Sequence, residues 1–309
     1  MKRVLVTGGN GFVGKHLVKE LAKNNIEVVV VDRPGGKIEK SEFVTSYLQL
    51  DLNSAEETRQ IPFKDIDGVI HLAGLAAVGP SFDDPMLYIT TNMGIEVNLF
   101  EAALAQQAKP RFLVVSSGNL YDASAHLPLT ENSLVSPSSP YDVSKMGQEQ
   151  LAQYYETRDF ECIIARPFNH FGPGQGLGFI VPDLTKQVIE IEKGLSSEIL
   201  VGNLDAQRDY TDVRDIARAY RLLLEKGKTG EIYNLCSGVA HSGSDMLAGI
   251  LANTDCKPEI KQDSSKVRPS DNPIIYGSPK KLTDHTGWKP EIPFETTLAD
   301  VVADWRSRV

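Results

Sequence analysis

The stretch RVLVTGGNGFVGKHLVKELAKNNIEVVVVD, residues 3–32, decides the fold of this chain. Its apolar, β-branched ends predict two buried strands, over residues 2–7 and 26–31. Between them lie a glycine-rich turn and a helix that ends near Asn24. This order of strand, glycines, helix and strand is typical of a dinucleotide-binding unit.

The residues of the glycine-rich turn have separate roles in such a unit. Gly8 permits a tight turn, Gly11 lets the backbone approach a pyrophosphate, and Gly14 allows the helix to pack closely. Phe12 and Val13 stand at the helix N-terminus, where backbone N–H groups face an anion. We therefore expect these five residues to contact a dinucleotide cofactor.

The two residues after the second strand bear on which cofactor binds. Asp32 can accept hydrogen bonds from the adenosine ribose, and its charge repels a 2′-phosphate, which favours NAD(H). Arg33 follows directly and offers a cation to that phosphate, which leaves NADP(H) as the alternative. A solvated loop charge is the other interpretation of Arg33.

Continued alternation of strands and helices predicts an α/β fold with a doubly wound parallel sheet. We expect one strand to end at Asp51, others over 68–72, 111–115 and 161–166, and helices over 83–108 and 141–158. Ligands of such sheets bind beyond the carboxyl ends of the strands. Further cofactor contacts are expected from Asp51, Leu52, Leu72, Ala73, Gly74 and Asn92, although Asn92 can instead tie structural elements together.

Three polar residues between 116 and 145 indicate carbonyl or alcohol redox chemistry. Tyr141 and Lys145 are four residues apart, so they share one face of a helix. An ammonium beside the phenol favours the phenolate, so we expect Lys145 to lower the pKa of Tyr141. Ser117 follows an apolar strand and offers a hydroxyl that can orient a carbonyl oxygen. The predicted catalytic residues are Ser117, Tyr141 and Lys145.

Composition and charge exclude several classes of function. The chain has 309 residues, of which 41% are hydrophobic and 24% charged, and its net charge is −9. An acidic protein is not expected to bind nucleic acid non-specifically. The chain lacks an apolar run of the roughly 20 residues that span a membrane. Its three cysteines have neither metal-site nor disulfide spacing. We expect no metal site, no membrane association and a cytoplasmic location.

The chain resembles the extended short-chain dehydrogenase/reductase family over essentially its whole length. The resemblance rests on TGGNGFVG at 7–14, HLAG at 71–74, the serine, tyrosine and lysine set, RPFN at 166–169 and TGWKP at 286–290. It implies that Tyr141 is the catalytic acid/base, that Lys145 also holds the nicotinamide ribose, and that Arg166 belongs to the cofactor site.

The resemblance also implies two domains and a homodimer. Residues 1–167 and 212–240 would form a Rossmann domain that binds NAD(P). Residues 168–211 and 241–309 would form a smaller α/β domain that binds a nucleotide-sugar. Within that part, 168–179 is rich in glycine and proline and is expected to be a loop. Trp288 is expected to pack the smaller domain.

The second half is similar to the GDP-sugar branch of the family. The similar segments are NHFGPGQ at 169–175, VGNLDAQRD at 201–209 and TDVRDIARAY at 211–220. The resemblance implies that Asn169, Arg208 and Arg268 contact the sugar diphosphate, and a guanidinium is suited to phosphate. A surface salt bridge is the other interpretation of Arg208. Asp183 is our candidate for the guanine, or else it complements a helix dipole. Ser81, Asn119 and Phe179 are further candidate substrate contacts.

The residue at position 119 separates the reactions that the family performs. In the family's dehydratases a glutamate lies two residues after the catalytic Ser or Thr, and this chain has Asn119 there. An amide cannot donate and regain a proton at neutral pH. The resemblance therefore favours NAD(P)H-dependent reduction of the C4 ketone of a GDP-4-keto-6-deoxy-D-mannose, giving GDP-D-rhamnose or its C4 epimer GDP-6-deoxy-D-talose.

Three alternatives to reduction stay open. A nucleotide-sugar 4-epimerase needs only the three catalytic residues and a tightly held NAD. A GDP-mannose 4,6-dehydratase is disfavoured by Asn119. A cofactor-sensing scaffold is disfavoured because such proteins typically lose Tyr141 or Lys145.

Overall fold

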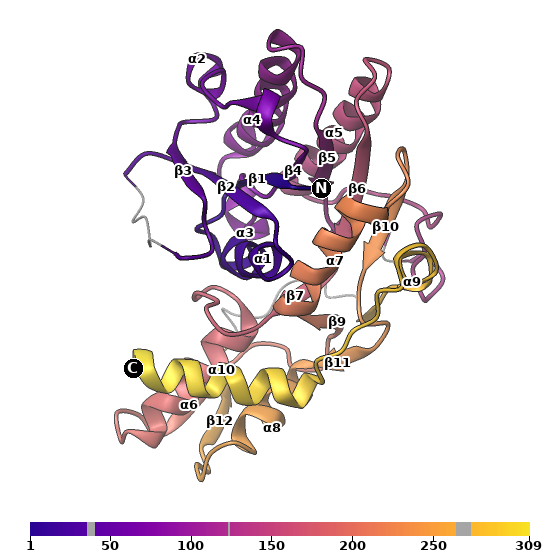
Figure 1. The fold of residues 1–309 in the computed structure, drawn as a ribbon. Coiled ribbons are helices and arrows are strands. Elements are labelled where there is room, and N and C mark those ends of the chain that lie inside the picture. The colour runs from indigo at the N-terminus through magenta and orange to yellow at the C-terminus, as the bar shows by residue number, and fades with distance from the viewer. Residues whose placement is uncertain (36–40, 123, 264–272) are drawn as a thin grey trace.

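The larger sheet of the protein is parallel throughout and organises the first half of the chain. The computed structural model describes residues 1–35, 41–122, 124–263 and 273–309. Seven strands run in the order β10–β6–β5–β4–β1–β2–β3 (Figure 1). They are β1 (Arg3–Thr7), β2 (Glu27–Asp32), β3 (Ser46–Gln49), β4 (Gly68–His71), β5 (Arg111–Val115), β6 (Cys162–Pro167) and β10 (Ile232–Leu235). The predicted doubly wound α/β fold is confirmed.

Helices cover both faces of this sheet because alternate strand residues point to opposite sides. Val4 and Val6 face one core together with α1 (Phe12–Lys23) and α7 (Val213–Lys226), whereas Leu5 faces the other. The second face is covered by α4 (Pro85–Ala105) and α5 (Pro140–Glu156), with the short helices α2 (Ala55–Thr58), α3 (Val78–Ser81) and η1 (Phe63–Asp65) nearby. The 3₁₀ turn η2 (Gly118–Leu120) links β5 to the segment before α5.

A smaller layer of strands and helices lies beyond one end of the large sheet (Figure 1). Its four-stranded sheet contains β7 (Asn169–Phe171), β9 (Gln207–Asp212), β11 (Ala240–Ser242) and β13 (Ile274–Ile275). A separate parallel pair joins β8 (Glu198–Val201) to β12 (Glu259–Gln262). The helices α6 (Ile180–Glu192), α8 (Gly243–Leu251) and α10 (Phe294–Arg308) share one core with these strands.

Two sequence expectations about the second half are wrong. The segment 168–179 is not entirely a loop, because residues 169–171 form β7 and pair with β9. Trp288 does not pack the smaller layer: it is fully buried in the core beneath α1 and α7, and its indole nitrogen donates to the Asp215 carbonyl at 2.9 Å. The reason is the position of α9 (Lys280–Thr286), which packs against α7 and β10. Because Trp288 follows α9 by two residues, it also packs beside the large sheet.

Two structural features are absent from the part of the chain that the structure describes. Among the described residues, no helix is long and apolar enough to cross a membrane. Over the same residues, no group of three or more His, Cys, Asp or Glu side chains is placed to hold a metal ion.

Candidate active site

The glycine-rich turn between β1 and α1 leaves room for a phosphate next to the helix. A Cβ on Gly14 would overlap the Gly8 carbonyl oxygen, so α1 can start here only with glycine. Gly8 itself has φ +71°, and a Cβ there would lie 3.0 Å from the Ala73 nitrogen. Gly11 caps α1 without a side chain, and no acidic residue occupies the first turn. Phe12 and Val13 therefore present the N–H groups of an uncapped helix terminus.

The turn is held against the end of β4 by a buried polar contact that the sequence did not reveal. The Thr7 hydroxyl accepts from the backbone N–H groups of Leu72 and Ala73, each at 3.1 Å. It also lies 2.8 Å from the His71 Nδ1. Because the two N–H groups use the oxygen's lone pairs, the hydroxyl proton points to His71. The predicted contacts Leu72 and Ala73 are thus brought beside Gly8.

Asn92 supports this loop through its side chain. The amide oxygen accepts from the Leu75 N–H at 2.7 Å, and the amide nitrogen donates to the Leu75 carbonyl and to Ser144. A Cβ on Gly74, whose φ is +152°, would lie 2.7 Å from that amide oxygen. Asn92 is fully buried, and its side chain ties structural elements together.

Asp32 and Asp51 end neighbouring strand regions, and both carboxylates accept backbone hydrogen bonds. Asp32 accepts from the Asn10 N–H at 2.9 Å and from the Arg33 N–H at 3.0 Å, so it is fixed beside the glycine-rich turn. Asp51 accepts from Asn53, and the adjoining Leu52 is buried. Arg33 is exposed.

Ser117, Tyr141 and Lys145 converge at the carboxyl end of β5, as the sequence predicts. Ser117 follows β5 directly, and its hydroxyl accepts from the Asn119 N–H at 3.1 Å. Tyr141 and Lys145 lie in the first two turns of α5, which begins at the Ser139 cap. The Lys145 Nζ is 5.9 Å from the centre of the Tyr141 ring. All three side chains are largely buried.

The protonation of Tyr141 differs from the sequence expectation. Burial raises the pKa of Tyr141 to about 12, and a hydrogen bond with Ser117 only partly opposes the rise. The predicted lowering by Lys145 is therefore wrong for this geometry. The reason is the direction of the ammonium, which donates to the Val115 carbonyl and to the Gln148 amide oxygen, each at 2.9 Å. In the structure Tyr141 is a neutral phenol with a proton to donate.

Lys145 lies in a buried polar cluster on α4, α5, β4 and β6. Burial lowers its pKa to about 8, and the carboxyls of Glu96 and Glu149 oppose that change. Gln148 connects Lys145 to His71, whose Nε2 lies 3.3 Å from the amide nitrogen. Burial also lowers the pKa of His71 to about 3, so this imidazole is neutral. Sequence spacing did not single out Glu96, Gln148 or His71, because polar residues inside helices give no burial signal.

Arg166 has a structural partner in this cluster. Its guanidinium donates to both Glu149 oxygens, at 2.8 and 2.7 Å, and stacks on Tyr121 with 4.9 Å between the cation and the ring centre. Glu149 also accepts from Ser116 at 2.5 Å. The side chain of Arg166 is buried and joins β6 to α5, and its role in cofactor binding stays a prediction.

The smaller sheet brings two of the predicted substrate residues together. Asn169 on β7 is paired with Tyr210 on β9, and Arg208 stands two residues earlier on β9. Because side chains alternate along a strand, Asn169 and Arg208 lie on one face of this sheet. Arg208 also donates to the Gln207 carbonyl. Arg268 lies outside the described residues.

The other predicted substrate residues have separate surroundings. Asp183, in the first turn of α6, accepts from the Gly178 N–H at 2.9 Å, and Phe179 caps that helix with its ring half exposed. Asn119 is exposed beside Ser117. Ser81 is buried and donates to the Val78 carbonyl at 2.6 Å.

The start of α1 also contacts the substrate half. The Phe12 ring stacks on His170 with ring centres 6.4 Å apart, and His16 hydrogen-bonds the Pro173 carbonyl at 2.8 Å. The glycine-rich turn and the segment after β7 are therefore neighbours.

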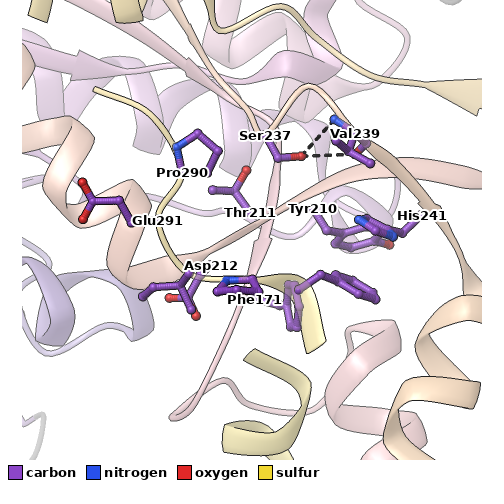
Figure 2. Close-up of a pocket in the computed structure, with 12 residues that line it drawn as sticks. Phe171, Tyr210, Thr211, Asp212, Ser237, Val239, His241, Pro290 and Glu291 are labelled. Carbon is purple, nitrogen blue, oxygen red and sulfur yellow. Dashed lines mark hydrogen bonds between the residues drawn. The ribbon is translucent and has the colours of Figure 1, made fainter. Parts of the chain in front are cut away.

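A separate pocket of about 250 Å³ lies where β9 and β11 meet the segment leading into α10 (Figure 2). Aromatic residues dominate it, and His241 stacks on Phe294 at 3.8 Å. Its wall contains none of Ser117, Tyr141 or Lys145. We therefore distinguish it from the site at the end of β5.

The residues present fit a nicotinamide dinucleotide. The Cβ-free cradle at Gly8 and Gly14 adjoins the N-terminus of α1, and Asp32 is fixed at the ribose position of such a unit. When bound, a nicotinamide supplies or accepts a hydride. Tyr141 can donate a proton to a carbonyl oxygen, and Ser117 can orient that oxygen. A parallel Rossmann sheet with this serine, tyrosine and lysine set defines an extended short-chain dehydrogenase/reductase.

Comparison with known proteins identifies the family within this class to which the chain belongs. It belongs to the family described as GDP-mannose 4,6 dehydratase, whose model matches residues 5–301. It is 35% identical to GDP-6-deoxy-D-mannose reductase of Pseudomonas aeruginosa, over 100% of this chain and 98% of that protein. It is 30% identical to GDP-6-deoxy-D-talose 4-dehydrogenase of Aggregatibacter actinomycetemcomitans, over 92% of this chain and 91% of that protein. The protein is thus a nucleotide-sugar oxidoreductase.

Solved structures agree with this assignment. RMD from Pseudomonas aeruginosa complexed with NADPH has a TM-score of 0.90 and 34% identity, with all of both chains covered. A Thermus thermophilus UDP-glucose 4-epimerase in complex with NAD has a TM-score of 0.86 and 29% identity, over 99% of this chain and 100% of that chain. The protein accordingly uses a nicotinamide cofactor.

Proposed function

We propose that the protein reduces the C4 ketone of GDP-4-keto-6-deoxy-D-mannose to GDP-D-rhamnose or to its C4 epimer GDP-6-deoxy-D-talose. This proposal rests on the kinds of side chain that lie together at the end of β5. Ser117 and the neutral phenol of Tyr141 can deliver one proton to a carbonyl oxygen, while Asn119 beside them is an amide. Dehydration needs a second acid/base group near C5 and C6. Reduction needs only one proton donor and a hydride.

Each residue then has a stated part in the reaction. Ser117 donates a hydrogen bond to the C4 oxygen, and Tyr141 protonates that oxygen as negative charge develops on it. Lys145, protonated below a pKa of about 8, binds the nicotinamide ribose through its ammonium. The buried surroundings of these groups strengthen both interactions.

We propose that the two parts of the chain divide the ligands. Residues 1–167 and 212–240 hold the cofactor, and residues 168–211 and 241–309 hold the nucleotide-sugar, except that α9 packs on the large sheet. Asn169 and Arg208, on one face of the small sheet, are placed to bind the diphosphate. Asp183 is the candidate for guanine, because a carboxylate can accept from two guanine N–H groups.

NADH is the cofactor that we propose as preferred. Asp32 is fixed by two backbone N–H groups, so its negative charge cannot easily turn away from a 2′-phosphate. The exposed Arg33 next to it keeps NADPH as the competing choice. The ratio of kcat/KM for the two cofactors decides this point. An Asp32→Ala variant should move that ratio toward NADPH.

A homodimer and a cytoplasmic location complete the proposal. Exposed apolar side chains lie at the start of α4 and along α5, and their burial in a dimer is favourable. They are Phe82, Met86, Leu87, Val143 and Tyr154. The three cysteines are free thiols, which suits a reducing compartment.

The test uses freshly made GDP-4-keto-6-deoxy-D-mannose with NADH or NADPH. We expect cofactor oxidation by the natural protein and a loss of about 100-fold or more in kcat for Tyr141→Phe, which removes the proton donor. Undiminished reduction by Tyr141→Phe would refute the catalytic role. Conversion of a GDP- or UDP-hexose to its C4 epimer without added reductant would favour the epimerase.

A further inference from the structure

Glu96 is a buried carboxyl that the mechanism above does not use. It lies on the face of α4 that packs against α5, and it is fully buried. Neither of its oxygens has a hydrogen-bond partner among the described residues. A buried carboxyl without a partner is costly to retain. Its position therefore needs an explanation in terms of its neighbours.

The neighbours of Glu96 include the catalytic lysine. The charge of Lys145 and the amide of Gln148 favour ionisation of the Glu96 carboxyl, whereas Glu149 disfavours it. Gln148 in turn accepts from the Lys145 ammonium at 2.9 Å. Glu96 and Lys145 are thus both neighbours of the Gln148 amide, in a region that excludes water.

The other titratable groups of the cluster are already accounted for. Glu149 accepts from Arg166 through both of its oxygens, in a bidentate ion pair. His71 on β4 is neutral, because burial lowers the pKa of its imidazole to about 3. Cys162 on β6 is a neutral thiol, because burial raises its pKa. Tyr141 is a neutral phenol for the same reason.

While Lys145 is protonated, the charge balance of the cluster depends on Glu96. Lys145 and Arg166 contribute two positive charges, and Glu149 contributes one negative charge. With Glu96 ionised, the four groups have no net charge, and with Glu96 protonated they bury one uncompensated cation. Uncompensated buried charge is unfavourable, so the ionised carboxyl supports the protonated lysine.

We propose that Glu96 is a positioning residue that acts as the buried counter-charge of Lys145 and keeps the catalytic lysine protonated. Its effect reaches the substrate only through Lys145, whose ammonium donates to the Val115 carbonyl at the end of β5. Burial raises the pKa of Glu96 well above its usual range and lowers the pKa of Lys145, and the charge of each group opposes the effect of burial on the other.

The direct test measures the pKa of Lys145 in the apoprotein. The ε-carbon NMR signal of ¹³C-labelled Lys145, assigned with Lys145→Met, is followed against pH. Glu96→Gln keeps the size of the side chain and removes its charge. We expect the midpoint to fall by about one pH unit or more. Glu96→Met, a second neutral variant, should give the same direction of change if Glu96→Gln fails to fold.

Glu101→Gln is the matched control, because Glu101 is on the same helix, is exposed and is bonded to Tyr155 instead. This control should leave the Lys145 midpoint unchanged. An unchanged midpoint in both Glu96 variants would overturn the proposal. The same result in the control as in Glu96→Gln would also overturn it, since the effect would then not be specific.

The kinetic arm rests on the proposed function. In Glu96→Gln, the alkaline fall of kcat/KM for keto-sugar reduction should move to lower pH by the same amount as the NMR midpoint. A shifted midpoint with an unshifted rate profile would refute the link to catalysis. If the natural protein reduces no keto-sugar, the proposed function is wrong. The NMR titration still decides whether Glu96 keeps Lys145 protonated.

Discussion

Tyr141 and Lys145 respond to one buried environment in opposite directions. Burial disfavours charge, so it raises the pKa of the phenol to about 12 and lowers the pKa of the ammonium to about 8. The phenol is thus a proton donor at every physiological pH. Lys145, by contrast, loses its proton and its charge in mildly alkaline solution. At the scale of single residues, Lys145 sets the upper pH limit of the reaction.

The rate of ketone reduction should therefore depend on pH through Lys145. A group with a lowered pKa is protonated below that pKa and loses its proton above it. We expect kcat/KM to be level well below pH 8, to be about half of that level near pH 8 and to fall further above it, while Tyr141 stays protonated. Steady-state kinetics from pH 6 to 10, at matched ionic strength, measure this. A level profile up to pH 10 would contradict the assignment.

Residue spacing predicted the catalytic set but not its protonation. The interval of four between Tyr141 and Lys145, after a serine at a strand end, was sufficient to place three side chains together. It could not show that the ammonium turns toward the Val115 carbonyl, or that burial dominates the phenol. Glu96 escaped notice because its burial depends on how α4 packs against α5, which no local pattern encodes.

At the scale of elements, β6 and α5 are joined by the pair between Arg166 and Glu149. Both side chains are almost completely buried, with exposed fractions of 4% and 2%, and the bond is bidentate. Breaking such a pair leaves a charge without compensation, whereas replacing both members removes the charges together. The pair therefore has a testable structural role.

Arg166→Met should destabilise the fold by about 3–5 kcal/mol, because Glu149 is left buried and unpaired. The double variant Arg166→Met with Glu149→Leu should recover most of that loss. Urea unfolding followed by circular dichroism gives the free energies of these two variants and of Glu149→Leu alone. If the two single losses simply added in the double variant, the pair would not be coupled.

Elements with a clear period were predicted closely, and elements without one were missed. β-branched runs located β1, β2, β5 and β6, and the fixed order of motifs located α1 and α5. By contrast, β7 has three residues inside a Gly- and Pro-rich segment, and it exists because it pairs with β9. The position of Trp288 likewise follows from packing of α9 against the large sheet, a contact between segments distant in sequence.

At the scale of the whole molecule, the exposed apolar side chains on α4 and α5 account for the proposed dimer. Met86 on α4 is 68% exposed, and Phe82, in the turn between α3 and α4, is 60% exposed. A Met86→Glu variant should dissociate the dimer, because it would bury a charge in the interface. Sedimentation velocity measures the change in mass.

Leu195→Glu is the matched control for that variant. Leu195 is 69% exposed but lies after α6, in the other part of the chain. Its substitution should leave the mass unchanged. A natural protein that sediments as a monomer at all concentrations would contradict the proposed dimer.

The central claim is that the site reduces a keto-sugar and does not dehydrate a GDP-hexose. The most direct measurement incubates the protein with GDP-4-keto-6-deoxy-D-mannose and NADH in one reaction, and with GDP-mannose and NAD⁺ in another, and identifies the products by NMR. The account predicts one NADH oxidised per C4-reduced GDP-6-deoxyhexose in the first reaction and no 4-keto product in the second. Formation of the 4-keto sugar from GDP-mannose, or no oxidation of either NADH or NADPH by the ketone, would contradict it.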